Sequence, residues 1–184
     1  MVRLPSKKGD FFMSHFRQIS SDEFQNSVFH TIAKEWMLIT AEQQLDGKPV
    51  ANTMTASWGG LGHLWNQDVA FTFIRPQRYT KQFVDNSEYF SLCFFGGDKM
   101  EELRYLGTAS GRDEDKIARS GLTLTHIDGV PCFEEATAVL ICRKLYVQTI
   151  KPECFVDSAL CQSVYPKQDF HDLYIGGIEK ILVR

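Results

Sequence analysis

Short apolar runs recur along the chain, and several of them end at a Gly, Pro or Asp-Gly signal. Runs of about four to eight residues bounded in this way are typical of β-strands. The run over 136–150 is long for one strand, so we expect it to bend at a corner of a barrel. The full set of expected strands covers residues 36–41, 50–55, 69–74, 89–95, 122–127, 136–150 and 174–183.

A four-residue spacing marks the first expected helix. Phe24, Val28 and Ile32 fall on one face of such a helix. Ser20 and Glu23 have the spacing of a capping box, in which each residue satisfies a free backbone N–H of the other. We therefore expect a helix that begins at Ser20.

Three further helices are expected between the strands. Pro76 closes the preceding strand, because it lacks a backbone N–H and restricts the residue before it, and a helix follows over about 80–85. Asp98 and Glu101 again have capping-box spacing, ahead of an apolar helical face. The residues of that face are Met100, Leu103 and Leu106. The polar stretch 110–116 leads into a short last helix.

The remaining segments predict turns, a loop and one domain. Asp46-Gly47 is a turn signal, and residues 57–67, with three Gly and no regular period, predict a loop. Residues 1–19 predict an irregular N-terminal arm, and residues 20–184 a single domain. Strands come in clusters with isolated helices between them, so we expect a mainly β fold with peripheral helices (α+β), an antiparallel barrel.

Composition excludes several classes of protein. The 184 residues are 43% hydrophobic and 23% charged, as in ordinary globular domains. The net charge is -3 and no basic stripe is visible, so we expect no nucleic-acid partner. Aromatic residues reach 12%, which fits either a well-filled β core or a site for a flat conjugated ligand.

The cysteines and apolar runs indicate a cytoplasmic protein. The five cysteines include no Cys-x-x-Cys pair, so free thiols in a reducing compartment are expected. The N-terminal residues mix charges without an apolar core and do not resemble a signal peptide. No apolar run approaches the roughly 20 residues of a membrane helix, and we expect no membrane association.

Common catalytic motifs are missing from the sequence. No G-x-G-x-x-G follows a strand, no Walker loop is present, and no G-x-S-x-G elbow occurs. The five histidines are scattered without metal-ligand spacing, so no metal site is expected.

One strand carries an unusual set of small polar residues. The segment comprises Asn52, Thr53, Met54, Thr55, Ala56, Ser57 and Trp58. It fits an edge strand with one solvated face. It also fits a ligand-binding edge, where small residues let backbone groups approach the polar rim of a flavin ring and Trp58 packs against the ring.

Two arginines precede the helix expected at 80–85. Arg75 and Arg78 lie three residues apart, and Thr80 is a good N-cap residue. A helix N-terminus with a guanidinium is a natural phosphate site, because free N–H groups and paired donors both favour an anion. A purely structural strand-to-helix junction is the alternative.

Taken together, these segments resemble the flavin reductase-like family, the FMN-binding split-barrel group that includes the flavoredoxins. The resemblance runs from about Trp36 to Leu182. The segments that carry it are residues 52–60, 69–80, 110–116 and 171–178.

The resemblance implies an antiparallel split β-barrel of the FMN-binding type and a homodimer with FMN near the subunit interface. It implies ring and ribityl contacts from residues 52–58, and phosphate contacts from residues 75–80 with Arg78 and Thr80 preferred. His171 either approaches the flavin or satisfies a core hydrogen bond. Beyond the seven residues of the strand, the implied cofactor contacts are Arg75, Arg78, Tyr79, Thr80, Arg112, Lys116 and His171, with Arg112 and Lys116 supplied by either subunit.

The function implied is an NAD(P)H-dependent flavin reductase, in which a hydride passes from NADH or NADPH to FMN. Hydride transfer requires no acid or base from the protein, so no catalytic side chain is expected. An electron carrier that takes electrons from a redox partner protein shares the same motifs, as does an FMN-binding protein without turnover.

Overall fold

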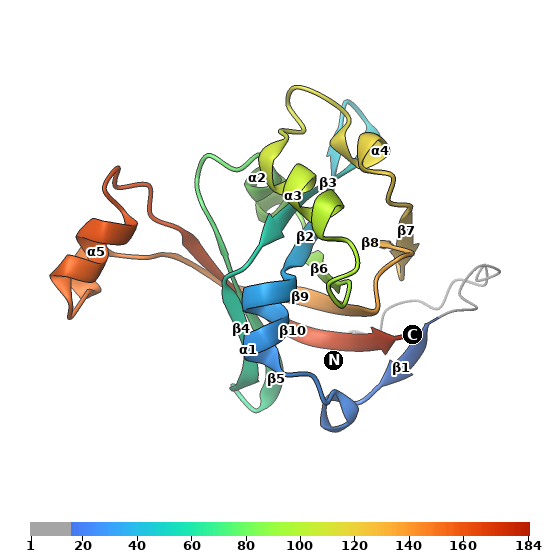
Figure 1. Cartoon of the computed structure of the whole chain (residues 1–184), viewed down its shortest axis with the longest axis horizontal. Helices are drawn as coiled ribbons and strands as arrows, with labels where there is room; N and C mark the ends of the chain where they lie inside the picture. Colours follow the sequence, from blue (N-terminus) through green and yellow to red (C-terminus); the bar gives the residue numbers. More distant parts are fainter. Residues whose placement is uncertain (1–15) are drawn as a thin grey trace.

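Strand β10 (Asp172–Val183) organises the sheet in this computed structural model, which describes residues 16–184. It pairs with β9 on one side, with β5 on the other, and with β1 near its C-terminal end. Every ladder is antiparallel, and the strand order is β3-β2-β6-β9-β10-β5-β4. The expected antiparallel β fold with peripheral helices is therefore confirmed (Figure 1).

The strands before β10 are β1 (Arg17–Ile19), β2 (Met37–Leu45), β3 (Lys48–Ala56), β4 (Gly59–Leu64), β5 (Gln67–Ile74), β6 (Tyr89–Phe94), β7 (Leu124–Ile127), β8 (Val130–Phe133) and β9 (Ala138–Thr149). The helical segments are η1 (Ser21–Glu23), α1 (Val28–His30), η2 (Thr31–Glu35), α2 (Thr80–Asn86), α3 (Met100–Thr108), α4 (Lys116–Ser120), η3 (Pro152–Cys154) and α5 (Ser158–Val164).

Two-residue turns close three of the hairpins. Asp46-Gly47, Trp65-Asn66 and Asp128-Gly129 all have positive φ at both positions. This geometry matches the twist of paired strands and favours Asn, Asp and Gly. The turn expected at Asp46-Gly47 is confirmed.

The loop expected over 57–67 is wrong, because β4 occupies most of it and pairs with β5. Glycines at 59, 60 and 62 contribute no side chain, so the alternation that marks a strand is not visible there. The small hairpin β7–β8 was also missed beyond 127. Its Asp-Gly turn was the available signal.

The helix expected from Ser20 is broken. The capping box itself forms: the Ser20 backbone N–H and hydroxyl both donate to Glu23, at 2.9 and 3.0 Å. It caps only the short turn η1, and helical structure resumes at Val28. Asn26 and Ser27 intervene, and such side chains compete with helical backbone hydrogen bonds.

Two other expectations at chain ends and caps are corrected. Lys99 precedes α3 without a side-chain cap, so Asp98 and Glu101 form no capping box. Residues 17–19 of the expected irregular arm form β1, because they complete the exposed end of β10. The rest of that arm, residues 1–15, lies outside the described residues.

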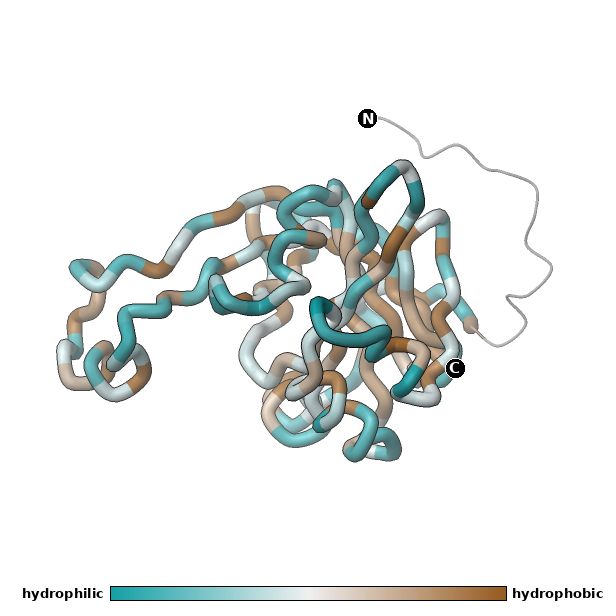
Figure 2. Tube along the Cα trace, turned by 90° about the horizontal axis from the view of Figure 1, so that it is seen from above, coloured by the Kyte–Doolittle hydropathy of each residue, from teal (hydrophilic) through white to brown (hydrophobic). Residues whose placement is uncertain are grey.

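The long strand expected over 136–150 is β9, and its ladder with β10 is irregular at two places. The β9–β10 ladder shifts register between Ile175 and Gly176 and again between Ile178 and Lys180. Such irregularities increase local twist and let a sheet curl. Hydrophobic residues gather along the curled strands, while turns are mostly hydrophilic (Figure 2).

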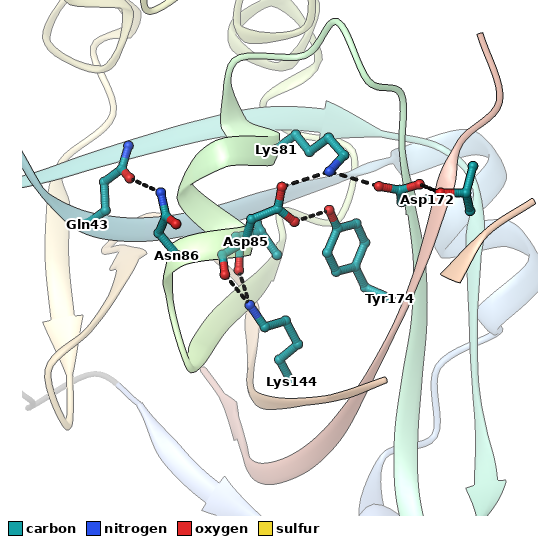
Figure 3. Close-up of polar contacts among 9 residues, drawn as sticks. Gln43, Lys81, Asp85, Asn86, Lys144, Asp172 and Tyr174 are labelled. Carbon is teal, nitrogen blue, oxygen red and sulfur yellow. Dashed lines mark hydrogen bonds and ion pairs between the residues drawn. The ribbon is translucent and has the colours of Figure 1, made fainter. Parts of the chain in front are cut away.

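A charged network fastens α2 to β10 (Figure 3). Lys81 lies 2.7 Å from Asp85 and 2.8 Å from Asp172, and the buried Tyr174 hydroxyl donates to Asp85 at 2.6 Å. Lys144 donates to the last carbonyls of α2, at Val84 and Asp85. The network fixes the start of α2 relative to the start of β10.

Residues 150–171 form an arm that projects from the barrel and carries η3 and α5 at its far end (Figure 1). Val156 and Leu160 on this arm are exposed. Within residues 16–184, no helix has the length and apolar content that a membrane crossing requires.

Candidate functional site

The end of β3 opens into a cavity of about 360 Å³. This volume falls in the usual range for small-ligand sites. The cavity brings together eight of the residues expected from the sequence. Its lining consists of Met54, Thr55, Ala56, Ser57, Trp58, Phe73, Arg75, Arg78, Gly107 and His171.

Arg78 is the cation of this cavity that has no acidic partner. Its Nη1 donates to the Gly107 carbonyl at 2.8 Å. Within residues 16–184, no carboxylate forms an ion pair with it. Burial lowers the pKa of the guanidinium, which still stays charged at neutral pH. A partly buried guanidinium with unused donors favours an anionic ligand.

Arg75 has different surroundings. It forms an ion pair with Asp169 and lies 5.3 Å from the ring centroid of Tyr165. Its Nη2 also donates to the Val164 carbonyl at 3.4 Å. The base of the arm therefore already neutralises Arg75, although its side chain lines the cavity.

Trp58 and His171 form the aromatic side of the cavity. Their ring centroids lie 4.9 Å apart, and Trp58 is 45% exposed. His171 Nδ1 lies 2.9 Å from the Tyr165 hydroxyl. Burial, followed by the nearby Arg75 charge, lowers the pKa of His171 to about 4, so the imidazole is neutral at pH 7. His171 thus makes the core hydrogen bond and also reaches the cavity.

The first polar residues of the expected site are bonded inside the protein. Asn52 Nδ2 donates to Thr80 Oγ1 at 3.0 Å, and that hydroxyl donates to the Thr53 carbonyl at 2.9 Å. Thr53 Oγ1 lies 2.8 Å from Thr40 Oγ1. β3 is indeed an edge strand, but Asn52 and Thr53 are buried and do not form a solvated face.

Thr80 does not cap α2. Tyr79 holds the cap position and Thr80 is the first helical residue, with its side chain turned to β3. Thr80 is 1% exposed, and its hydroxyl is used by two partners on β3, the Asn52 amide and the Thr53 carbonyl, so it is not available to cap the helix.

A second cavity of about 710 Å³ lies beside the first and receives Asn52, Tyr79, Arg112 and Lys116. The Arg112 guanidinium lies 4.5 Å from the centroid of Tyr79. Lys116 is buried, and its ammonium donates to the carbonyls of Leu106 and Ala109, both at 3.0 Å. Twelve of the fourteen residues expected from the sequence therefore divide between the two cavities, while Thr53 and Thr80 are buried and line neither.

Sequence reasoning missed Phe73 and Gly107 in the cavity lining. A Cβ at Gly107 would lie 3.2 Å from the Thr55 Cβ, so this glycine lets α3 approach β3 closely. An isolated Gly within a helical pattern was the available signal. Phe73 is one of several apolar residues of β5, and nothing in the sequence distinguishes an apolar residue that faces a cavity from one that packs in the core.

The family model described as "Flavin reductase like domain" matches residues 29–184. No curated protein matches.

Several solved structures are similar. An FMN-binding domain of a flavin-reductase-like enzyme from Shewanella baltica OS155 has a TM-score of 0.63 at 14% identity, covering 92% of this chain and 77% of that one. The flavoredoxin of Desulfovibrio vulgaris (Miyazaki F) has a TM-score of 0.60 at 19% identity, covering 90% and 77%.

An NADH:FAD oxidoreductase from Streptomyces globisporus C-1027, in complex with NAD and FAD fragments, has a TM-score of 0.58 at 13% identity, covering 81% and 79%. At these identities the similarity establishes the fold, and the expected split barrel is confirmed.

Proposed function

Since this chain belongs to the flavin reductase-like family, we propose that it binds FMN in the cavity at the end of β3 and acts as an NAD(P)H-dependent flavin reductase. The observation that carries the proposal is the half-buried Arg78, which lines the cavity without an acidic partner in residues 16–184. The NADH:FAD oxidoreductase with the same fold supports a nicotinamide donor.

The donor set fits FMN at both ends. Arg78 offers charged donors suited to the phosphate. The stretch from Thr55 to Trp58 offers small side chains and accessible backbone for the ring, and Trp58 supplies an aromatic wall. Neutral His171 adds a polar group that carries no charge into the cavity.

The protein's contribution is orientation. FMN supplies the hydride-accepting chemistry when bound. Arg78 holds the anionic end, and α3 supports Arg78 through the Gly107 carbonyl. Tyr165 fixes the His171 ring through Nδ1, and His171 in turn lies against Trp58. Arg78, His171 and Trp58 are therefore held in position before a ligand binds.

The test has two steps. Purified protein is titrated with FMN and followed by flavin fluorescence, and NADH or NADPH is then added without oxygen. The proposal expects saturable FMN binding followed by rapid loss of the flavin's visible absorbance. Protein that neither contains nor binds flavin would refute the proposal.

An FMN electron carrier is the second candidate. The 45% exposure of Trp58 at the cavity favours it, because an exposed aromatic beside a cofactor suits contact with a redox partner protein. The structural similarity to a flavoredoxin supports the same reading. FMN that binds but is not reduced by NADH or NADPH would favour the carrier over the reductase.

A homodimer with FMN near the interface belongs to the same proposal. The projecting arm supports it, because Val156 and Leu160 leave apolar surface in water at a distance from the barrel (Figure 1). The base of that arm also holds Arg75 at the cavity through Asp169. A second copy that packs along the arm from its far end to its base would therefore reach the residues beside the cavity.

A further inference from the structure

Arg112 fastens the chain on both sides of Arg78. Its Nη1 donates to the Gln77 carbonyl at 3.3 Å, and its guanidinium lies over the Tyr79 ring at 4.5 Å. Gln77 and Tyr79 are the sequence neighbours of Arg78. Arg112 therefore restrains the backbone from which the Arg78 side chain projects.

Lys116 holds the end of α3, which provides the carbonyl that binds Arg78. Arg78 donates to the Gly107 carbonyl, while the Lys116 ammonium donates to the carbonyls of Leu106 and Ala109 on either side. Lys116 is only 3% exposed. Cations at the C-terminal end of a helix satisfy its free carbonyls and complement its dipole. Lys116 thus fixes the carbonyl that orients Arg78.

Arg78 and Lys116 place two positive charges around the C-terminal end of α3. Neither Arg78 nor Lys116 forms an ion pair within residues 16–184. The charged groups that act on Lys116 are Arg78, which opposes its charge, and Glu114, which favours it. An anion beside Arg78 would relieve the repulsion between the two cations.

We propose that Arg112 and Lys116 are positioning residues, which hold Arg78 in the orientation that receives the phosphate of FMN and do not themselves contact it. Lys116 adds a charge that strengthens phosphate binding from within the protein. This inference rests on the proposed binding of FMN and assigns to both residues a role different from direct phosphate contact.

The charge of Lys116 should make the affinity for the FMN phosphate depend on pH. Burial, followed by the nearby Arg78 charge, lowers the pKa of Lys116 to about 8. The phosphate of FMN is a dianion above about pH 7, because its second pKa is about 6. Lys116 is charged below pH 8 and loses its charge as the pH rises. Affinity for the phosphate should therefore fall between about pH 7.5 and 9.5.

The first test measures FMN and riboflavin affinity of the unaltered protein over this pH range. Riboflavin has the same ring and no phosphate, so it reports every effect of pH on the ring. We expect FMN affinity to fall about three- to tenfold while riboflavin affinity stays constant. Parallel changes for both ligands, or none for FMN, would overturn the role of Lys116. Failure to bind either flavin would instead refute the proposed function.

Variants separate positioning from contact. Lys116→Met should abolish the pH dependence and weaken FMN binding about three- to tenfold at pH 7.5, and Lys116→Arg should restore the affinity. A loss in Lys116→Met as large as that in Arg78→Ala would assign a direct contact and overturn the proposal. If Lys116→Met fails to fold, the pH series on the unaltered protein still decides.

Two substitutions of Arg112 distinguish the effect of its positive charge from the effect of its flat guanidinium group. Arg112→Lys keeps a positive charge but loses the flat guanidinium over Tyr79. If Arg112 acts by position, Arg112→Lys and Arg112→Gln should weaken FMN binding equally, by about two- to fivefold, with riboflavin unaffected. Full affinity in Arg112→Lys alone would show that its charge acts directly and would contradict the inference.

Discussion

At the scale of single residues, partners decide what each side chain is free to do. Arg75 and Arg78 lie three positions apart and line the same cavity. Arg75 is paired with Asp169, whereas the hydrogen-bond partner of Arg78 within residues 16–184 is the Gly107 carbonyl. Two arginines therefore differ in role: Arg75 binds the base of the arm, and Arg78 keeps donors that can bind an anionic ligand.

Replacement of Arg78 should affect phosphate recognition alone. Arg78→Ala is expected to weaken FMN binding by about 1.5–3 kcal/mol, the usual range for a hydrogen bond to a charged group. Riboflavin binding should change little. Arg75→Ala is the matched control, since it should affect both flavins equally. Unchanged FMN affinity in Arg78→Ala, measured by fluorescence titration, would refute the phosphate assignment.

His171 should make stability sensitive to mild acid. Its pKa is lowered to about 4 in the folded protein, below that of an unfolded histidine. The unfolded chain therefore takes up a proton first, and stability falls as the pH drops from about 6.5 toward 4. Between pH 7.5 and 5 this amounts to about 2 kcal/mol.

Urea unfolding at the two pH values checks this expectation. His171→Gln should lose about 2 kcal/mol less than the unaltered protein on acidification. His30→Gln, at an exposed position, serves as control and should behave like the unaltered protein. Equal losses in all three would contradict the assignment of the acid sensitivity to His171.

At the scale of elements, the β9–β10 ladder contains two adjacent glycines with different surroundings. A Cβ at Gly176 would lie 2.7 Å from the Phe90 ring and 2.8 Å from the Cys142 Cβ. A Cβ at Gly177 would meet the ends of Gln67 and Leu145 at 3.0 Å. The first position faces a rigid core, and the second faces side chains that can turn away.

Alanine at these two positions should therefore differ in its effect. Gly176→Ala is expected to destabilise the protein by about 1–3 kcal/mol through overpacking, and Gly177→Ala by less than about 1 kcal/mol. Chemical unfolding measures both, each variant serving as the control of the other. Similar losses in the two variants would show that strand propensity, and not contact with Phe90, sets the effect.

Elements with a clear hydrophobic period could be predicted from the sequence, and others could not. The strand expected at 89–95 matches β6 within one residue at either end, and the strand expected at 69–74 matches the end of β5, which begins two residues earlier at Gln67. β4 could not be predicted, because its glycines have no side chains to show a period. The short helices of the arm, η3 with three residues and α5 with seven, are too short for a hydrophobic period to repeat.

The candidate site shows a similar division. The sequence pattern grouped β3, the Arg75–Arg78 segment and His171 as one candidate site, and residues of all three line the same cavity. The state of each side chain depended on partners outside its own motif, such as Asp169 for Arg75 and Leu106 for Lys116. Such partners are set by tertiary packing, which a local motif does not encode.

At the scale of the whole molecule, the arm of residues 150–171 projects from the barrel and leaves Val156 and Leu160 exposed (Figure 1). We expect a second copy to bury it. Val156→Asp combined with Leu160→Asp should convert a homodimer into monomers, because charges cannot be buried there without partners.

Light scattering after size-exclusion chromatography measures the mass. Phe29→Asp, on the exposed side of α1, is the matched control and should remain dimeric. A monomeric unaltered protein, or a dimer that survives both arm substitutions, would contradict this role of the arm.

The central place of β10 also determines how the protein can be made. Among residues 16–184, β4 and β5 join the rest of the main sheet only through β10, which is the last strand of that part of the chain. A ribosome therefore delivers two partial sheets with open edges before it delivers the strand that connects them. The main sheet cannot be completed until β10 has been made, and until then the open edges of β5 and β9 are exposed to pairing with other nascent chains.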